Sequence, residues 1–148
     1  MNGTQLCATV AGLSLAGRSV YVIDPEQNRA LCESLGTAPA EDGGAHPIFF
    51  FIATQVGMGL SVAELCAACE FDVKDGPMMA SSHVDFARPL MTATEYRVQG
   101  EIRSLTRKSS RKFGVMDLLD FELRLVGADG EPVLGCTHVW VLPRRVNE

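Results

Sequence analysis

Residues 47–69 read PIFFFIATQVGMGLSVAELCAAC and form the longest apolar run in the chain. Drawn as a helix, the run is apolar on nearly every side, which is typical of a helix that is buried all round. Gly57 and Gly59 each lower helix propensity by about 1 kcal/mol, but they allow a sheet backbone to approach closely. We therefore predict a buried helix as far as about Met58, followed by a bend or a short second helix over SVAELCAAC.

A shorter helix is predicted upstream of this run, over residues 25–35 (PEQNRALCESL). Asp24 is a favourable N-cap, and Pro25 fits the first helical position. Gly36 can take the left-handed conformation that often follows the last turn. The loop at 36–45 (GTAPAEDGGA) is rich in helix breakers and joins this helix to the apolar run.

Beyond about Ser81 the pattern changes to strands. Residues 95–103 (EYRVQGEIR) and 119–126 (LDFELRLV) alternate apolar and charged side chains, so each strand has one buried face. The residues predicted to point inward are Tyr96, Val98, Ile102, Leu119, Phe121, Leu123 and Leu125.

Two turns are predicted between the strands. Residues 104–114 (SLTRKSSRKFG) are predicted to be a polar turn, and residues 128–131 (ADGE) a second hairpin turn. The last strand, 132–143 (PVLGCTHVWVLP), carries few charges and is predicted to be central in its sheet. An antiparallel sheet wrapped around the apolar helix would cover that helix economically. We expect one α+β domain over 1–148, with 1–17 a poorly defined N-terminal segment.

Composition limits the classes of partner. The chain has 148 residues and a net charge of −5, which gives no general attraction for nucleic acid or anionic membranes. No stretch approaches the roughly 20 consecutive apolar residues that span a bilayer. No Lys or Arg precedes Arg18, so the basic start of a secretory signal is missing. The five cysteines are an odd number, which suits reduced thiols. We expect a cytoplasmic protein.

Four motifs then follow one another in a definite order. They are DPEQNRALCESLG (24–36), GGAHPIFFF (43–51), HVDFARPL (83–90) and GCTHVWVL (135–142). Over about residues 18–143 the chain resembles hotdog-fold proteins, and more narrowly the MaoC-like and FAS1-like dehydratase families. The resemblance implies an antiparallel sheet around a central helix. It also implies acyl thioesters of coenzyme A or acyl carrier protein as ligands, with no further cofactor.

Enzymes of these families hydrate a trans-2-enoyl thioester or dehydrate the (R)-3-hydroxyacyl form. Active members resemble one another in a Gly-Asp-x-Asn-Pro-x-His motif that supplies an Asp and His pair. Here Gly36-Thr37 stands where Gly-Asp belongs, and residues 38–40 (APA) supply neither the Asn nor the His. The resemblance therefore implies an acyl-thioester-binding subunit, in a homodimer or heterodimer with a second hotdog subunit. On that interpretation the partner carries the Asp and His, and the lyase activity belongs to the assembled complex.

His46 resembles the histidine that begins the family's central helix. Pro47 replaces the glycine that follows it and has no N–H to offer a thioester oxygen. The amides of Ile48 and Phe49 are the remaining donors at this helix start. Asp42 and His46 lie four residues apart in the loop and are the candidate catalytic pair of an autonomous hydratase. The simpler interpretation is a solvated Asp42 and a His46 that caps or orients the start of the helix.

Two further alternatives stay open. A thioesterase would need a carboxylate near the start of the central helix, and Glu64 comes late for that role. A non-catalytic homodimer that binds acyl-CoA fits the same residues. Coenzyme A phosphates or an acidic carrier protein could bind the basic stretch of the 104–114 turn, whose alternative is a solvated tip. The candidate contacts there are Arg107, Lys108 and Arg111, flanked by Arg103 and Lys112, with Arg88 as a second site.

The remaining candidates have simpler explanations. Cys66 and Cys69 have CxxC spacing but no second pair, so they are predicted to be buried small residues, with a metal or redox pair as the alternative. His83 and Asp85 share one face of a strand and are expected to be an exposed polar pair, with an acid and base in a substrate tunnel as the alternative. His138, in the last strand, is predicted to be an interior histidine with its hydrogen bonds satisfied.

Overall fold

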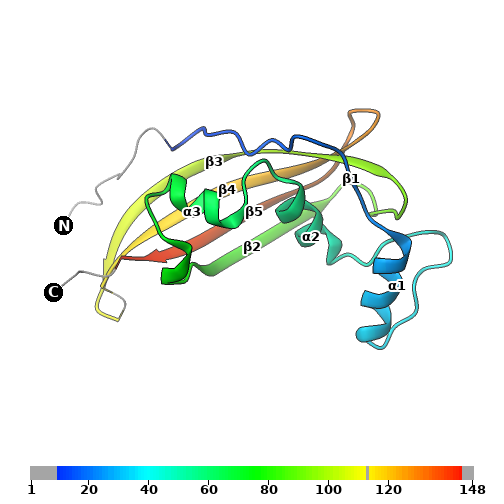
Figure 1. Cartoon of the computed structure of the whole chain (residues 1–148), viewed down its shortest axis with the longest axis horizontal. Coiled ribbons are helices and arrows are strands. Elements are labelled where there is room, and N and C mark those ends of the chain that lie inside the picture. The colour runs from blue at the N-terminus through cyan, green and yellow to red at the C-terminus, as the bar shows by residue number, and fades with distance from the viewer. Residues whose placement is uncertain (1–9, 113, 145–148) are drawn as a thin grey trace.

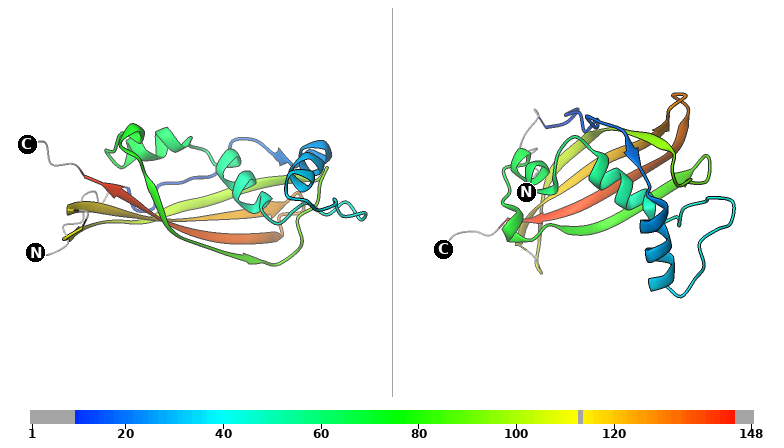
Figure 2. Two further views of the ribbon diagram at one scale, coloured as in Figure 1. Left: turned by 90° about the horizontal axis from the view of Figure 1, so that it is seen from below. Right: turned by 45° about the vertical axis from the view of Figure 1, so that its right-hand side comes forward.

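The computed structural model describes residues 10–112 and 114–144. One curled antiparallel sheet carries the helices on a single face (Figures 1 and 2). The strand order is β1-β3-β4-β5-β2, so β4 lies in the middle and β5, predicted to be central, lies between β4 and β2. The elements are β1 (Tyr21–Val22), α1 (Pro25–Ser34), α2 (Phe49–Gly57), α3 (Val62–Ala68), the short 3-10 helix η1 (Val73–Asp75), β2 (Met78–Phe86), β3 (Glu95–Ser110), β4 (Gly114–Gly127) and β5 (Pro132–Pro143).

The helices begin and end where the sequence predicts. Asp24 caps α1 by accepting the N–H of Glu26 at 3.1 Å, and Gly36 follows the helix with a φ of 74°. The apolar run breaks after Gly57 as expected. Ser61 and Glu64 then form a reciprocal capping box that starts α3.

The inward-facing residues of β3 and β4 are confirmed, because all seven are buried. The predicted polar turn at 104–114 is wrong in extent, since β3 continues to Ser110 and β4 begins at Gly114. Alternation persists through this stretch, with Leu105 buried on the helix side and Arg107 two residues later on the same face. Arg107 can occupy that face because it pairs with the Asp117 carboxylate directly across the ladder.

Asp117 is fully buried and is neutralised by two arginines. Arg107 Nε lies 3.1 Å and Arg144 Nε 2.7 Å from its carboxylate oxygens. Arg144 also donates to the carbonyl oxygens of Cys69 and Glu70 just after α3. This network ties the end of β5 and the long hairpin to the end of α3. A buried carboxylate is tolerated in such a place because it is paired on both sides.

The glycines near the break in the apolar run do serve close packing, but Gly59 meets backbone that lies outside the strands of the sheet and Gly57 meets a side chain. A Cβ on Gly59 would lie 2.3 Å from the carbonyl oxygen of Ala16, and one on Gly57 would lie 2.6 Å from Val98 Cγ2. The backbone at residues 12–17 therefore fits between β3 and the bend that joins α2 to α3.

That N-terminal stretch runs along the outer edge of β3. Leu15 N–H donates to Gly100 O and Gly17 N–H to Val98 O, both at 2.8 Å. This part of the segment predicted to be poorly defined is thus held by backbone hydrogen bonds. Residues 1–9, including Cys7, lie outside the described residues.

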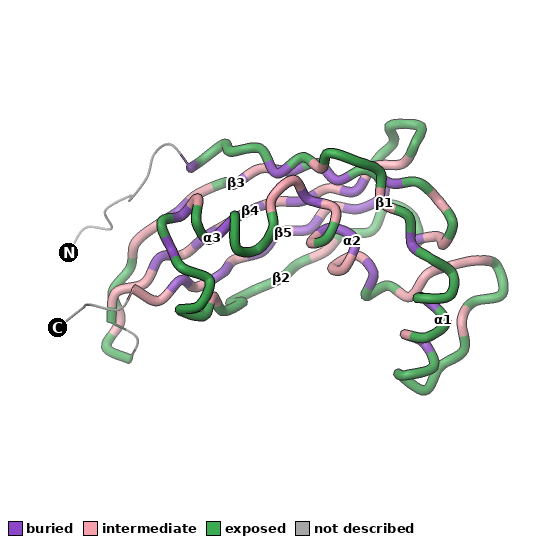
Figure 3. The backbone as a smooth tube through the Cα atoms, viewed as in Figure 1, coloured by how far each residue is buried: buried purple, intermediate pink, exposed green. Residues whose placement is uncertain are grey.

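The prediction that the central helix is buried all round is wrong for a single chain. Phe49, Ala53 and Thr54 are buried against the sheet, whereas Ile48 is 41% and Val56 67% exposed. The sheet covers only one side of α2 (Figure 3). Within the described ranges no single helix is long and apolar enough to cross a bilayer, and α2 with α3 reaches that length only as a pair bent by 62°.

We expect Gly59→Ala to lower the free energy of unfolding by about 1–3 kcal/mol, because the new methyl group would overlap the Ala16 carbonyl oxygen. Urea unfolding measures the change. Gly135→Ala is the matched control, since no atom lies within 4 Å of the Cβ it would add. A Gly59→Ala variant as stable as the control would contradict the packing described for the bend.

Candidate functional site

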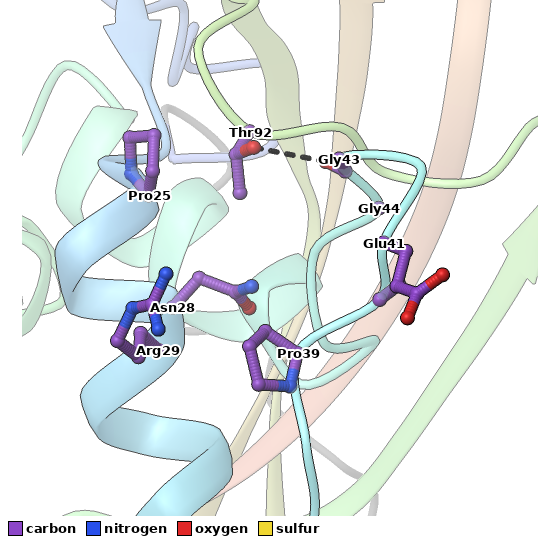
Figure 4. Close-up of a pocket in the computed structure, with 9 residues that line it drawn as sticks. Pro25, Asn28, Arg29, Pro39, Glu41, Gly43, Gly44 and Thr92 are labelled. Carbon is purple, nitrogen blue, oxygen red and sulfur yellow. Dashed lines mark hydrogen bonds between the residues drawn. The ribbon is translucent and has the colours of Figure 1, made fainter.

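The loop between α1 and α2 is pinned to the β2–β3 connection. Ala45 N–H donates to Leu90 O at 2.8 Å. Thr92 donates both its N–H and its Oγ1 hydroxyl to Gly43 O, each at 2.9 Å. Figure 4 shows the hydroxyl contact. The side chains of this loop are therefore held on a fixed backbone.

Asn28 on α1 anchors the same loop and was missed by the sequence reasoning. Its side chain is buried, and Oδ1 accepts the backbone N–H of His46 at 2.8 Å. Asn28 lies one helical turn before Cys32, and the two are the buried residues of α1. This spacing is the sequence feature that could have indicated a buried Asn28. A buried amide on that face needs a partner, which a polar loop can supply.

His46 caps the start of α2. Its Nδ1 accepts the N–H of Ile48 at 3.1 Å, so a neutral ring carries its proton on Nε2. The N–H of Phe49 donates to the His46 carbonyl oxygen at 3.0 Å. Both amides that were predicted to face a thioester oxygen are thus already bonded within this turn. The other ring nitrogen of His46, Nε2, takes no part in the hydrogen bonds of this turn.

Asp42 is turned into its own loop. Its Oδ1 accepts the N–H of Gly44 at 2.9 Å, and the residue is exposed. Across the described part of the chain, no hydrogen bond or ion pair joins Asp42 to His46. The structure therefore gives the two side chains separate local roles.

Two clefts flank the loop. One, of about 320 Å³, lies between α1 and the loop and is lined by Asn28, Arg29, Glu41 and Thr92 among others (Figure 4). The other, of about 410 Å³, is lined by His46 together with α1 and the loop backbone. Asp42 lines neither cleft. The carboxylate of Glu41 and the imidazole of His46 belong to different clefts, so neither cleft holds both.

The candidate phosphate contacts do not gather at one place in the chain. Lys108 is an exposed residue near the tip of the β3–β4 hairpin, and Arg111 lies in the turn itself, whereas Arg107 is bound to Asp117. Arg88 Nη1 lies 3.4 Å from Asp129 in an exposed ion pair. The hairpin tip is at the opposite end of the sheet from α1 (Figure 1).

His83 and Asp85 form an exposed pair, as expected. Their side chains are 3.0 Å apart and 70% and 86% exposed. In the ladder they lie opposite Thr137 and Gly135, between the inward-facing residues of β5. Opposed residues share a face, so the pair lies on the side of the sheet away from the helices.

Cys66 and Cys69 are both buried. Burial, with a smaller contribution from Asp72, raises the pKa of the Cys66 thiol. No group of three His, Cys, Asp or Glu side chains in the described ranges is placed to hold a metal ion.

His138 is interior, but the prediction that it is satisfied is wrong. The residue is 0% exposed, and neither ring nitrogen has a hydrogen-bond partner among the described residues. Its neighbours are aromatic, with the Phe51 ring 5.7 Å and the Phe121 ring 5.2 Å away between centroids. Burial among these rings lowers the pKa of His138.

The chain matches no protein-family model and no curated protein by sequence. Among solved structures it is similar to the HadBC (3R-hydroxyacyl-ACP dehydratase) complex of Mycobacterium tuberculosis, with 16% identity, a TM-score of 0.68, and coverage of 92% of this chain and 99% of that one. It is also similar to a MaoC-like dehydratase from Rhodospirillum rubrum, with 14% identity, a TM-score of 0.65, and coverage of 99% of this chain and 100% of that one. The similarity to the ChsH1–ChsH2 complex of M. tuberculosis has 10% identity, a TM-score of 0.63, and coverage of 91% of this chain and 85% of that one. The chain therefore has the hotdog fold, as predicted.

The pKa of His138 gives a prediction for stability against pH. Because burial lowers that pKa below the ordinary 6.5, the unfolded chain binds the proton first as the pH falls. The stabilisation that the folded chain gains by keeping His138 neutral is complete above pH 6.5. It is lost as the pH falls through the folded-state pKa of His138. We expect His138→Phe to flatten the loss of stability as the pH falls below about 6.5.

Urea unfolding at several pH values checks this expectation. The exposed variant His83→Gln is the control and should keep the pH dependence of the unmodified chain. A His138→Phe protein that loses stability on acidification as steeply as the control would show that His138 does not titrate as an isolated buried group.

Proposed function

We propose that this chain is an acyl-thioester-binding hotdog subunit of an (R)-specific enoyl-thioester hydratase or 3-hydroxyacyl dehydratase, with the Asp and His pair on a partner subunit. The observation that supports it best is the start of α2. There the Ile48 N–H donates to His46 Nδ1, and the Phe49 N–H donates to the His46 carbonyl oxygen. Hydration needs an acid and a base together, and Asp42 is not joined to His46.

A partner subunit is supported by the surface that one chain leaves uncovered. All nine residues of β2 are exposed or half-buried, and the strand pairs with β5 on one side only. The outward side of α2 adds Ile48 and Val56, which are 41% and 67% exposed, so burying the rest of each side chain would contribute about 1 kcal/mol for Ile48 and about 1–2 kcal/mol for Val56. Two of the similar structures, HadBC and ChsH1–ChsH2, are themselves complexes.

Antiparallel pairing of β2 with the partner's corresponding edge would bring the separated candidate residues together. The Phe86 end of β2 lies by the start of α2, since the rings of Phe50 and Phe86 are 6.2 Å apart. The Met78 end lies toward the hairpin tip, because Met78 pairs with Val141 and Val141 with Leu118. Reversing the partner strand places the partner's hairpin tip near this chain's α2 start.

In the proposed complex, the exposed cations of the hairpin bind the phosphates of coenzyme A or acidic groups of a carrier protein. Arg107 has a smaller part in it than the sequence suggests, because its guanidinium is bonded to Asp117. Lys108 and Arg111 are the exposed members. Arg88 can contribute only by exchanging its weak contact with Asp129.

We expect the double variant Lys108→Gln, Arg111→Gln to bind octanoyl-CoA roughly tenfold more weakly at low salt, because two exposed charges that face phosphate are removed. The difference should shrink as added salt screens the contact. Isothermal titration of the purified chain, in the oligomer in which it is isolated, measures the affinity.

Arg97→Gln is the matched control, since Arg97 is an exposed cation of β3 at the end far from the hairpin tip. Sedimentation of the same samples reports the oligomeric state. Failure to bind octanoyl-CoA at all would contradict the proposed function. A monomer that binds as tightly as the oligomer would contradict the shared site.

A further inference from the structure

Three side chains of α2 and β5 have buried nitrogen atoms without a partner among the described residues. They are Gln55 Nε2, both ring nitrogens of His138, and Trp140 Nε1. His138 and Trp140 are more than nine-tenths buried. Buried polar groups are nearly always hydrogen-bonded, and leaving one unpaired costs about 1–3 kcal/mol. Three such residues in one region therefore require a common explanation.

His138 and Trp140 are neighbours, and the helical repeat puts Gln55 on the side of α2 that contacts His138. His138 and Trp140 alternate on the inward face of β5, and the ring of Phe121 contacts both, with centroids 5.2 and 5.1 Å away. Phe51 on α2 lies against His138, and Gln55 is one helical turn beyond Phe51 on the same side. The aromatic rings around them offer no strong acceptor.

The atoms that need partners are mostly donors. The indole of Trp140 and the amide nitrogen of Gln55 can only donate, and a neutral His138 donates from one nitrogen and accepts at the other. The complementary group is therefore an oxygen acceptor. It is also uncharged, because a carboxylate placed among these neutral side chains would be buried without a counter-ion.

The region is one strand away from the open edge of the sheet. Ser82 of β2 lies opposite His138 in the ladder, so its side chain is on the same face, and it is exposed. Along α2, Gln55 is about 10 Å from Ile48 at the helix start. Neither cleft beside the loop is lined by these residues, so an acyl chain that begins at the start of α2 must displace side chains packed between the helix and the sheet to reach them.

We propose that Gln55, His138 and Trp140 form an internal site for a neutral carbonyl oxygen carried by the acyl group, remote from the thioester. The inference rests on the proposed function and adds a substrate class to it, namely keto-acyl rather than plain hydrocarbon thioesters. The three donors select the ligand by the hydrogen bonds that only an oxygenated chain can complete.

The test compares octanoyl-CoA with keto-octanoyl-CoA isomers in which the keto group is moved along the chain. Titration calorimetry on the full chain, in its isolated oligomer, should give one isomer roughly tenfold tighter binding than octanoyl-CoA. His138→Phe and Trp140→Phe should each reduce that preference. Thr137→Ser, on the opposite face of β5, should keep it.

Fluorescence gives an independent readout, because Trp140 is the one tryptophan in the sequence. Its emission should move to longer wavelength with the preferred keto isomer and not with octanoyl-CoA. Equal affinities with unchanged emission would overturn the inference, assign the three donors to ordered water, and leave the proposed function intact. Failure of every thioester to bind would overturn both.

Discussion

The helix α2 carries apolar side chains around most of its circumference, and a single sheet can pack against only one side of it. Phe49, Ala53 and Thr54 take the covered side, while Ile48 and Val56 remain exposed. The adjacent edge strand β2 is equally uncovered. The exposed apolar residues of α2 and the open edge of β2 are the surfaces that the proposed partner subunit would cover.

The start of α2 is also where the resemblance to MaoC-like dehydratases would place hydratase chemistry. Here the local hydrogen bonds are directed inward: Asn28 binds the His46 amide, and His46 binds the Ile48 amide. These contacts hold the start of α2 beside α1 and occupy His46 Nδ1 and the Ile48 N–H, while His46 Nε2 takes no part in them. The same histidine that resembles a family feature thus has a structural role in this chain.

Much of the fold could be predicted from local patterns. Alternation fixed the inward faces of β3 and β4, and Asp24, Pro25 and Gly36 marked the limits of α1. The length of the long hairpin could not be predicted, because it depends on the pairing of Arg107 with Asp117 across the ladder. The exposure of Val56 could not be predicted either, because an apolar pattern does not show which surface, if any, covers each side of a helix.

The site was predictable only in part. The order of the motifs placed His46 at the helix start, but the anchoring role of Asn28 depends on contacts 18 residues apart. The unpartnered nitrogens of His138 and Trp140 likewise depend on which side chains surround them, and no spacing rule records that.

Hydration of crotonyl-CoA by the purified chain, followed as loss of enoyl-thioester ultraviolet absorbance, tests the division of labour most directly. The account predicts no turnover by the chain alone, and turnover only when a partner subunit that carries the Asp and His pair is added. Turnover by the chain alone that disappears in His46→Ala and Asp42→Ala would contradict it and make the loop between α1 and α2 an active site.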